Sequence, residues 1–233
     1  LAQASLSVSP TSFTFPNTTV NATSVTNFTV SNSGGVASGA LSSSIGGTNP
    51  TQFSIGTNTC GTNPLAAGGV CTIQVIFQPT SIGVKSGSLN VSGTPGGTAA
   101  ATLGGTAISA AAITVTPNPQ AWGGVPVGMT ADRTLTVTNT GGTASGTVSV
   151  SLSGTNANQW SILAPTGTDC VSGGTVLSAA MTCTVRLRFS PTLVGPLSAS
   201  LNIAASPGGP ASGSLTGTGQ QAVLSGSVAA NAF

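Results

Sequence analysis

Four cysteines offer the widest choice of chemistry in this chain, because a cysteine can form a disulfide, hold a metal ion or act as a nucleophile. They are Cys60, Cys71, Cys170 and Cys183. Zinc sites typically combine cysteines with histidines or with a Cys-x-x-Cys pair, and the sequence has neither. A catalytic thiol would lack a histidine as its base. The cysteines therefore predict structural disulfides, and we expect no metal and no cofactor.

The other titratable side chains are too few for general acid–base catalysis. Six residues carry a formal charge: Lys85, Asp132, Arg133, Asp169, Arg186 and Arg188. Each aspartate has a structural neighbour in the sequence, Arg133 for the first and Cys170 for the second. Lys85 precedes Ser86, but adjacent residues of a strand point to opposite faces, so these two would not form a serine–lysine dyad. We expect no catalytic residues and no enzymatic activity.

Composition limits the partners as well as the chemistry. Charged residues make up 3% of the chain and the formal net charge is +2, whereas an ordinary soluble domain has roughly 25% charged residues. A nucleic-acid surface needs clustered lysine and arginine, and a membrane-spanning helix needs about 18 consecutive apolar residues. The sequence contains neither. Because low net charge favours self-association, we expect copies of the chain to associate with one another, with no nucleic acid and no membrane-spanning segment.

Short strands are the elements that would position these residues. Hydrophobic residues make up 39% of the chain and alternate with Ser and Thr in runs such as FTVSN, TLTVTN and TVRLRF. Such alternation is typical of half-buried strands, and clusters of Gly, Pro and Asn separate the runs as turns do. Chains rich in Ser, Thr and Gly are often disordered, but this chain has a regular apolar face to bury. The sequence predicts a folded all-β protein.

The chain contains two copies of one unit. Residues 71–83 read CTIQVIFQPTSIG and residues 183–195 read CTVRLRFSPTLVG. The two halves align with a shift of 107 residues in their early part and of 112 residues around these segments. We therefore predict domains at residues 1–107 and 108–219, followed by an uncharged tail at 220–233.

Each copy has the length and rhythm of an immunoglobulin-like β-sandwich, with about 100 residues and about seven strands. In the run CTIQVIF, alternate residues beginning at Cys71 share one face, which we expect to be core. Pro79 and Pro191 should end these strands, because proline cannot donate to the ladder. The predicted fold is two tandem sandwiches.

Pairing of the cysteines within each copy is the economical arrangement, because both copies contain two. Cys60 and Cys71 are 11 residues apart, and Cys170 and Cys183 are 13 apart. A disulfide closing a loop of this size contributes about 3 kcal/mol of stability. Lasting disulfides form in oxidising compartments. We therefore expect one internal disulfide per domain and a secreted or cell-surface protein.

Two arginines and two tryptophans are the side chains most suited to contact a partner. Arg186 and Arg188 lie on one face of a predicted strand, which is either a solvated face, a guarded edge or a contact with a partner subunit. Trp122 and Trp160 occupy positions where the first copy has phenylalanine, as core residues do. A glycan ligand stays open, but no feature of the sequence supports one.

The repeated motifs resemble a known group of domains. The pattern SP..F.F at Ser9, Pro10, Phe13 and Phe15, then V.NSGG, then C…C.I.V.F.PT..G…G.L.V, is similar to bacterial surface modules called choice-of-anchor D. These resemble the abnormal-spindle/hydin (ASH) and major-sperm-protein group of immunoglobulin-like domains. The resemblance covers residues 5–107 and 112–219 and implies tandem extracellular stalks, spacers or assembly units, without catalytic residues. Only the disulfide cysteines map across.

These observations favour a structural role over an adhesive one. We expect a secreted, non-enzymatic protein, from a bacterium, that forms an extracellular filament or surface assembly through strand-edge and domain–domain contacts. The tail at 220–233 is either a strand that pairs with a neighbouring subunit's sheet edge or the start of a further repeat. The alternative function is an adhesin or spacer module of a larger surface protein.

Overall fold

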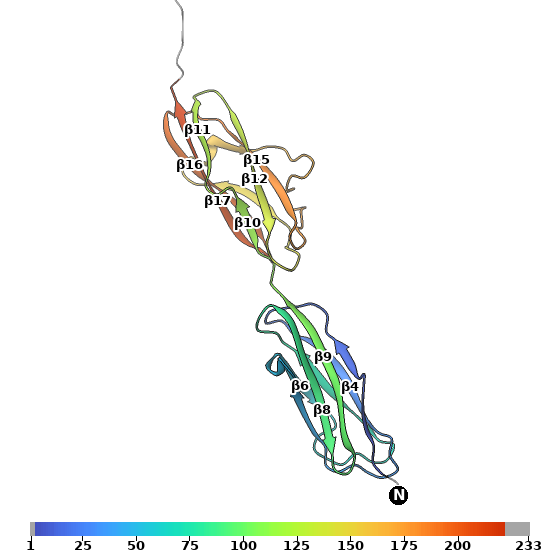
Figure 1. Cartoon of the computed structure of the whole chain (residues 1–233). Helices are drawn as coiled ribbons and strands as arrows, with labels where there is room; N and C mark the ends of the chain where they lie inside the picture. Colours follow the sequence, from blue (N-terminus) through green and yellow to red (C-terminus); the bar gives the residue numbers. More distant parts are fainter. Residues whose placement is uncertain (1–2, 222–233) are drawn as a thin grey trace, which may run out of the picture. The chain divides into compact units, whose positions relative to one another are not determined.

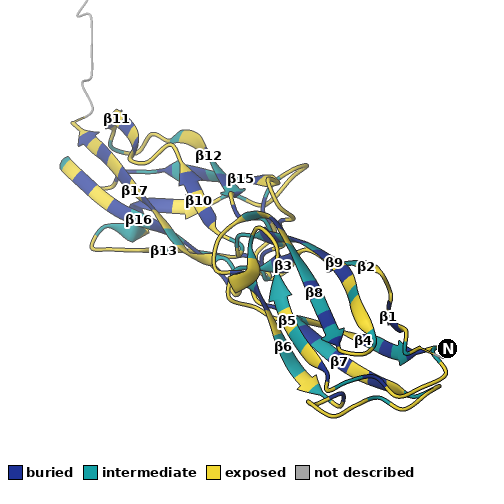
Figure 2. Cartoon of the chain, turned by 60° about the horizontal axis from the view of Figure 1, so that its bottom comes forward, coloured by how far each residue is buried: buried dark blue, intermediate teal, exposed yellow. Residues whose placement is uncertain are grey.

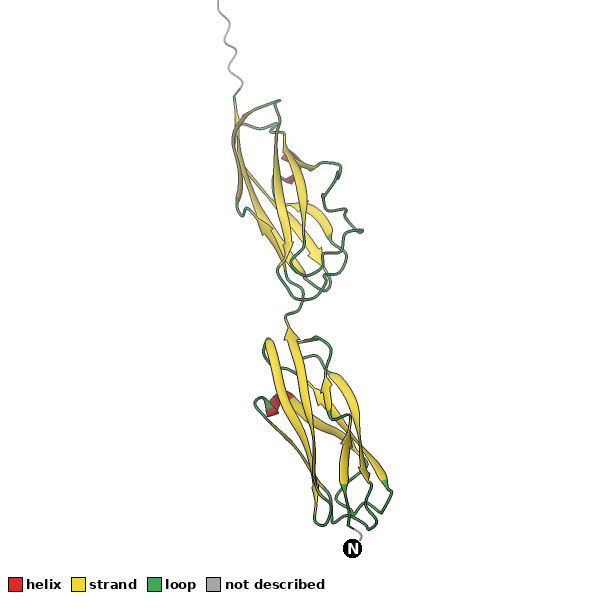
Figure 3. Ribbon diagram, turned by 45° about the vertical axis from the view of Figure 1, so that its right-hand side comes forward, coloured by secondary structure: helices red, strands yellow, loops and turns green. Residues whose placement is uncertain are grey.

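The computed structural model describes residues 3–221. The chain divides into two compact units between Ser109 and Ala110, called here the first and the second domain (Figure 1). Both consist of strands joined by loops (Figure 3), with one short 3₁₀ turn in each: η1 at Pro50–Gln52 and η2 at Ala157–Gln159. Among the residues that the structure describes, no helix is long and apolar enough to cross a membrane. The predicted all-β class is confirmed.

The first domain is a sandwich of two sheets. One sheet has the order β1 (Leu6–Ser9), β4 (Ser24–Asn32), β7 (Val70–Phe77) and β6 (Phe53–Asn58). The other has the order β2 (Ser12–Thr14), β9 (Gly97–Ile108), β8 (Gly83–Gly93) and β5 (Ser42–Gly46), with β3 (Thr18–Thr19) also paired to β9. The strands pair antiparallel, except that β2 and β3 run parallel to β9. The first segment of the chain therefore starts in one sheet and crosses to the other.

The second domain repeats this topology. One sheet has the order β10 (Ile113–Thr116), β12 (Ala131–Asn139), β15 (Thr182–Phe189) and β14 (Trp160–Ile162). The other has the order β11 (Gln120–Pro126), β17 (Gly209–Gln220), β16 (Gly195–Ala205) and β13 (Ser149–Ser153). β11 takes the place of both β2 and β3 and pairs parallel to β17. Two immunoglobulin-like sandwiches are therefore present, as predicted.

The core of each domain lies between its two sheets. Along β16 and β17, buried and exposed residues alternate (Figure 2), because successive side chains of a strand point to opposite faces. Phe77 and Phe189 are fully buried, each against a glycine of the opposite sheet. A Cβ atom at Gly105 would lie 2.7 Å from the Phe77 ring, and one at Gly217 would lie 2.6 Å from the Phe189 ring. These glycines let the aromatic ring pack directly on the strand backbone.

A buried asparagine organises one end of each sandwich. Asn139, the last residue of β12, has no exposed surface. Its Oδ1 accepts hydrogen bonds from the N–H groups of Ala112 and Gly141, both at 3.0 Å. Its Nδ2 donates to the carbonyls of Thr143 (2.8 Å), in the same loop as Gly141, and of Leu177 (2.9 Å), in the loop before β15. Because buried polar groups need partners, this one side chain joins three loops to the core.

Asn32 does the same in the first domain. It is the last residue of β4 and is 1% exposed. Its Oδ1 accepts from the N–H groups of Ser5 and Gly34, and its Nδ2 donates to the carbonyls of Val36 and Leu65. The two networks match bond for bond, which explains why the motif V.N.GG occurs in both repeats.

The disulfides pair as predicted, Cys60 with Cys71 and Cys170 with Cys183. Each joins the loop after β6 or β14 to the adjacent strand, β7 or β15. Each bridge therefore joins a loop to a strand of the same sheet, whereas the disulfide of antibody domains connects the two sheets. The bridge fixes the loop that follows a short edge strand.

The strand ends agree with the proline positions. β7 ends at Phe77 and β15 at Phe189, two residues before Pro79 and Pro191. At the C-terminal side, β17 extends to Gln220. The predicted tail at 220–233 otherwise lies outside the described residues, since these end at residue 221.

Candidate interaction surfaces

An ion pair occupies the outer face of β12 and β15 in the second domain. Arg188 Nε lies 2.8 Å from Asp132 Oδ1 and Arg188 Nη2 lies 2.9 Å from Oδ2, a bidentate arrangement. The two residues are directly opposite each other in the strand register. The hydrogen bond from Arg188 lowers the pKa of Asp132 and raises the pKa of Arg188. The partner of Asp132 is thus a residue 56 positions away, and the expected neighbour Arg133 only donates to the Asp132 main-chain oxygen.

A second ion pair lies next to the disulfide. Arg186 Nε is 2.8 Å from Asp169 Oδ2, and the Asp169 side chain is only 7% exposed. Asp169 also accepts hydrogen bonds from the Thr184 hydroxyl at 2.6 Å and the Thr166 N–H at 2.8 Å. These two bonds, together with Arg186, hold the pKa of Asp169 far below its ordinary value. The residue before Cys170 is therefore a connector between loop and strand.

From the sequence, Arg186 and Arg188 form either a solvated face, a guarded edge or a contact with a partner subunit. The structure places both on one face of β15, with each guanidinium paired to an aspartate of the same domain. The exposed fractions of the two side chains are 34% and 43%. A contact with a partner subunit stays a prediction, and it would have to use the remaining exposed edges of two ion pairs.

The same ladder in the first domain is neutral. Val25 and Ile76, which align with Asp132 and Arg188, face each other across β4 and β7. Thr59, which aligns with Asp169, shares a 3.0 Å hydrogen bond with the Thr72 hydroxyl. The first domain has a single charged residue, Lys85, so this face carries hydroxyl, amide and apolar groups only.

Lys85 forms a serine contact, but not with Ser86. The residue is only 8% exposed, and its Nζ donates to the Ser81 hydroxyl (2.9 Å) and the Ile82 carbonyl (3.2 Å). The second domain has the buried Leu197 at the aligned position. A nucleophilic serine needs an oxyanion site and room for a substrate beside it. Lys85 instead occupies a buried position, and its hydrogen bonds to Ser81 and Ile82 hold the loop before β8 in place.

Both tryptophans are core residues. Trp122 and Trp160 are each 4% exposed and pack edge to face, with ring centroids 5.9 Å apart. Trp160 also stacks on Phe189 at 4.4 Å. A platform for a sugar requires an exposed aromatic ring, and neither indole is exposed. Within residues 3–221, no cluster of three or more metal-ligating side chains occurs.

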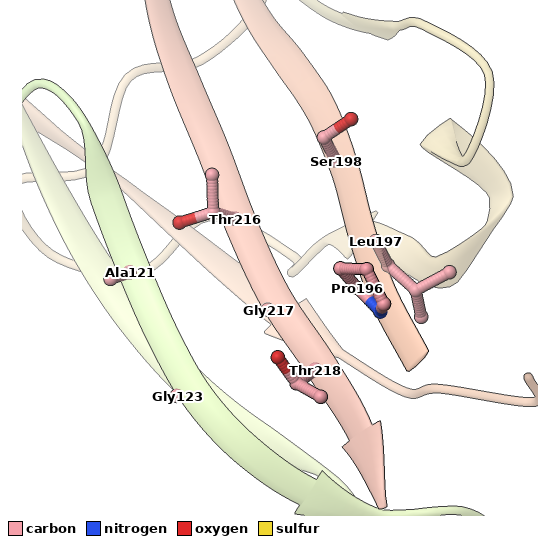
Figure 4. A pocket seen from close by; sticks show the side chains of 8 residues that line it. All are labelled: Ala121, Gly123, Pro196, Leu197, Ser198, Thr216, Gly217 and Thr218. Carbon is pink, nitrogen blue, oxygen red and sulfur yellow. The ribbon is translucent and has the colours of Figure 1, made fainter. Parts of the chain in front are cut away.

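A shallow hollow of about 320 Å³ lies on the outer face of the second domain. It forms where β11 leaves the register of β17 between Ala121 and Gly124. Figure 4 shows Ser198 on β16 beside Thr216 and Thr218 on β17, and the remaining lining residues are Ala, Gly, Pro and Leu. The hollow offers hydroxyl groups without a charged or aromatic side chain, and we assign no ligand to it.

The edge strands β5 and β13 occupy the same place in their sheets and align residue for residue. Beside β13, the loop at residues 171–176 runs along the start of the strand. Val148 N–H donates to the Thr175 carbonyl (2.8 Å), and Val150 N–H donates to the Ser172 hydroxyl (3.0 Å). This loop occupies the first half of the β13 edge.

The corresponding loop of the first domain is shorter. A bridge joins Ala40 to Pro64, four residues after Cys60, whereas the bridge from Thr147 reaches Val176, six residues after Cys170. In the part of the chain that the structure describes, one hydrogen bond reaches β5 from outside its sheet, from Asn58 Nδ2 to the Ser43 hydroxyl at 3.1 Å. The β5 backbone edge is therefore open. The cysteine spacing of 11 against 13 was the sequence signal for this difference.

Comparison with known proteins supports the fold of these domains. The family model Cep192 domain 4 matches residues 110–220, so the second domain is similar to ASH-like immunoglobulin-type domains. No curated protein matches the chain. A solved ASH/PapD-like domain of human CEP192 is 17% identical, covers 46% of this chain and 87% of its own, and has a TM-score of 0.33.

Tandem cadherin domains give the higher structural scores. Extracellular cadherin domains 1–4 of protocadherin gamma B7 are 9% identical with a TM-score of 0.56, covering 94% of this chain and 51% of that one. Domains EC22–24 of mouse cadherin-23 are 11% identical with a TM-score of 0.52, covering 95% and 67%. At these identities the likeness is one of fold. The chain spans about half the length of the protocadherin structure.

Proposed function

We propose that this chain is a secreted, non-enzymatic structural protein whose copies associate into an extracellular filament or surface assembly. The observation that carries the proposal is the open β5 edge in a domain without surface charge. Natural sheets guard their edges with charges, prolines or covering loops, because an unpaired edge is a template for another strand. β5 has the sequence SSSIG and contains neither a charged residue nor a proline.

The distribution of charge supports association between copies. Each domain has a net charge of +1, from Lys85 in the first and from three arginines and two aspartates in the second. Four of the charged side chains in the second domain neutralise one another in ion pairs. Long-range repulsion between copies is therefore weak, and low net charge promotes association.

The two disulfides support a location outside the cell, because such bonds persist in oxidising compartments. The aligned motifs and the family match of the second domain extend the proposal to both repeats as tandem ASH-like modules of the bacterial choice-of-anchor D kind. The tail residues 222–233 lie outside the described residues, and their role as a donated strand stays part of the proposal.

An adhesin or spacer role is the second candidate. Its support is the fold-level likeness to tandem extracellular cadherin domains. In that case the chain would hold a ligand-binding end away from the cell surface and would not need to contact other copies. We place it second because none of its loops shows a built ligand site within the described residues.

Sedimentation velocity and negative-stain microscopy of the purified chain separate the two. We expect the weight-average mass to rise with concentration and regular assemblies to form at the highest concentration. A chain lacking residues 222–233 tests the tail, since loss of assembly in that variant alone would assign the contact to the tail. A monodisperse monomer at all concentrations would contradict the structural role and favour the spacer.

A further inference from the structure

The strand β5 of the first domain is the specific surface that the structure offers to a partner. We infer that two copies of this chain pair through β5, antiparallel and about a twofold axis, with Ser44 of one copy opposite Ser44 of the other. The inference rests on the proposed self-association and names one of its contacts, because a twofold contact joins copies in pairs and a larger assembly needs a second contact.

The direction of the backbone groups at this edge follows from the aligned strand. In the second domain, Val150 N–H points away from β16, because it donates to Ser172 of the covering loop. Ser43 aligns with Val150, and its neighbour β8 has the register of β16. Along an edge strand, outward N–H and C=O groups recur at every second residue. Ser43 and Ile45 therefore present their backbone groups outward.

These outward groups match those of a second copy. A twofold axis at Ser44 places Ser43 of one strand opposite Ile45 of the other, so each strand supplies the donors and acceptors that its partner needs. The same axis places Ser42 opposite Gly46. No like charges meet, because β5 is uncharged and the one charge of the domain, Lys85, is buried against Ser81.

The side chains of β5 are compatible with this pairing. Ser42 and Ser44 are exposed on the outer face, while Ser43 and Ile45 are half-buried on the inner face. Pairing would extend the outer row of hydroxyl groups across the two copies and cover the remaining exposed surface of Ile45. The one bond from the other sheet, from Asn58, ends on the Ser43 hydroxyl and leaves the backbone groups of β5 unoccupied.

The second domain explains why β5 and not β13 is assigned. Its covering loop already accepts hydrogen bonds from the N–H groups of Val148 and Val150, and Gly173 N–H donates to the Val148 carbonyl at 2.7 Å. A partner strand would have to displace this loop, which the disulfide at Cys170 anchors. The two-residue extension of that loop therefore acts as the edge guard that the first domain lacks.

Opposite charges at position 44 test both the edge and the axis. Ser44→Lys and Ser44→Glu each place two like charges face to face, and like charges directly opposite are destabilising in a sheet. We expect each variant alone to raise the dissociation constant by up to about fivefold. An equimolar mixture of the two should associate at least as well as the unaltered chain, because the charges are then complementary. Sedimentation equilibrium over a concentration series measures all three.

Ser151→Lys and Ser151→Glu are the matched controls. Ser151 aligns with Ser44 and is also exposed on its strand, β13, so the same charge is added to the guarded edge. We expect these variants to associate as the unaltered chain does. Thermal unfolding of every variant shows whether it remains folded, and recovery of association in the mixture is itself a proof of folding.

The outcomes distinguish this inference from the function it rests on. If the unaltered chain stays monomeric, the proposed self-association fails and the inference with it. If the unaltered chain associates and neither Ser44 variant weakens it, the β5 edge is wrong while self-association stands. If both variants weaken association and their mixture does not restore it, the twofold register is wrong.

Discussion

The two domains have the same chain path, and each contains one disulfide and one buried asparagine. They differ on the outer face of the sheet that carries the disulfide. Where the second domain has Asp132 opposite Arg188, the first has Val25 opposite Ile76. The core residues behind these positions match, with Phe77 and Phe189 both fully buried. The buried faces and the polar connectors therefore define this fold, and the outer face is free to be ionic or neutral.

The domains differ again at one edge. The loop between the cysteines is two residues longer in the second domain, and the added length covers the start of β13. The first domain has no such covering loop. Its one charged residue, Lys85, is buried. One domain thus has both forms of protection against contact with other strands, and the other has neither.

Removing a disulfide should have the largest effect. We expect Cys60→Ser with Cys71→Ser to cost the first domain about 3 kcal/mol of unfolding free energy, and Cys170→Ser with Cys183→Ser to cost the second domain more than that. The second domain should lose more, because Asp169 is positioned by the loop at Cys170. Both tryptophans lie in the second domain, so tryptophan fluorescence during urea unfolding reports that domain alone, and hydrogen exchange reports the first. Equal losses would show that the ion pair beside Cys170 does not depend on the bridge.

Removing the buried asparagine should have the next largest effect, and it should be equal in the two domains. Asn32→Ala and Asn139→Ala each leave buried N–H and carbonyl groups without partners, which costs about 2 kcal/mol. The same two measurements of unfolding free energy check the values. As a control, Thr140→Ala removes an exposed hydroxyl next to Asn139 that donates to the Ala112 carbonyl at 3.1 Å. It should change stability little, because that carbonyl keeps its 2.8 Å bond from the Thr140 N–H. A loss in only one domain would break the equivalence of the two networks.

Acid should destabilise the second domain and not the first. The pKa of Asp169 is lowered by hydrogen bonds from Thr184 and Thr166 and by Arg186, and the pKa of Asp132 is lowered by Arg188. A carboxylate whose folded pKa is depressed stabilises the protein above its unfolded pKa of about 4, and this stability is lost as the pH falls below that value. Urea unfolding followed by tryptophan fluorescence from about pH 7 to about pH 2 should show the loss.

The first domain is the internal control, since its sequence contains no Asp or Glu. Its hydrogen exchange, corrected for the intrinsic effect of pH, should show no comparable decline. In the variant Asp169→Asn the decline of the second domain should be smaller. A first domain that weakens with acid as much as the second would contradict the assignment to these two aspartates.

Much of this arrangement follows from sequence, and the exceptions have physical causes. The alternation of apolar residues and the repeat predicted two sandwiches with one disulfide each. The neighbour in sequence suggested Arg133 for Asp132, but strand pairing brings Arg188 to it. The sequence separated Lys85 from Ser86, but it could not show that a loop brings Ser81 to Lys85. Periodicity within one strand cannot show which residue of another strand lies opposite. It also cannot show that Asn139 turns inward to join three loops.

Placing the ion pair of the second domain on the outer face of the first domain should have the smallest effect. We expect Val25→Asp combined with Ile76→Arg to change the unfolding free energy of the first domain by about 1 kcal/mol or less, because a pair on an exposed face contributes little. Val25 is 55% exposed, so its replacement removes little buried apolar surface. The two single variants complete a double-mutant cycle that isolates the pair.

Salt separates the electrostatic part of this small effect from the packing part. At about 1 M salt the screening length falls to about 3 Å, so any coupling between the introduced carboxylate and the introduced guanidinium should largely disappear, while a loss from removing Ile76 should persist. A loss of more than about 2 kcal/mol of unfolding free energy at both low and high salt would mean that Ile76 is part of the core and that packing requires the neutral face. A small, salt-dependent coupling would mean that the outer face can change its charge without changing the fold.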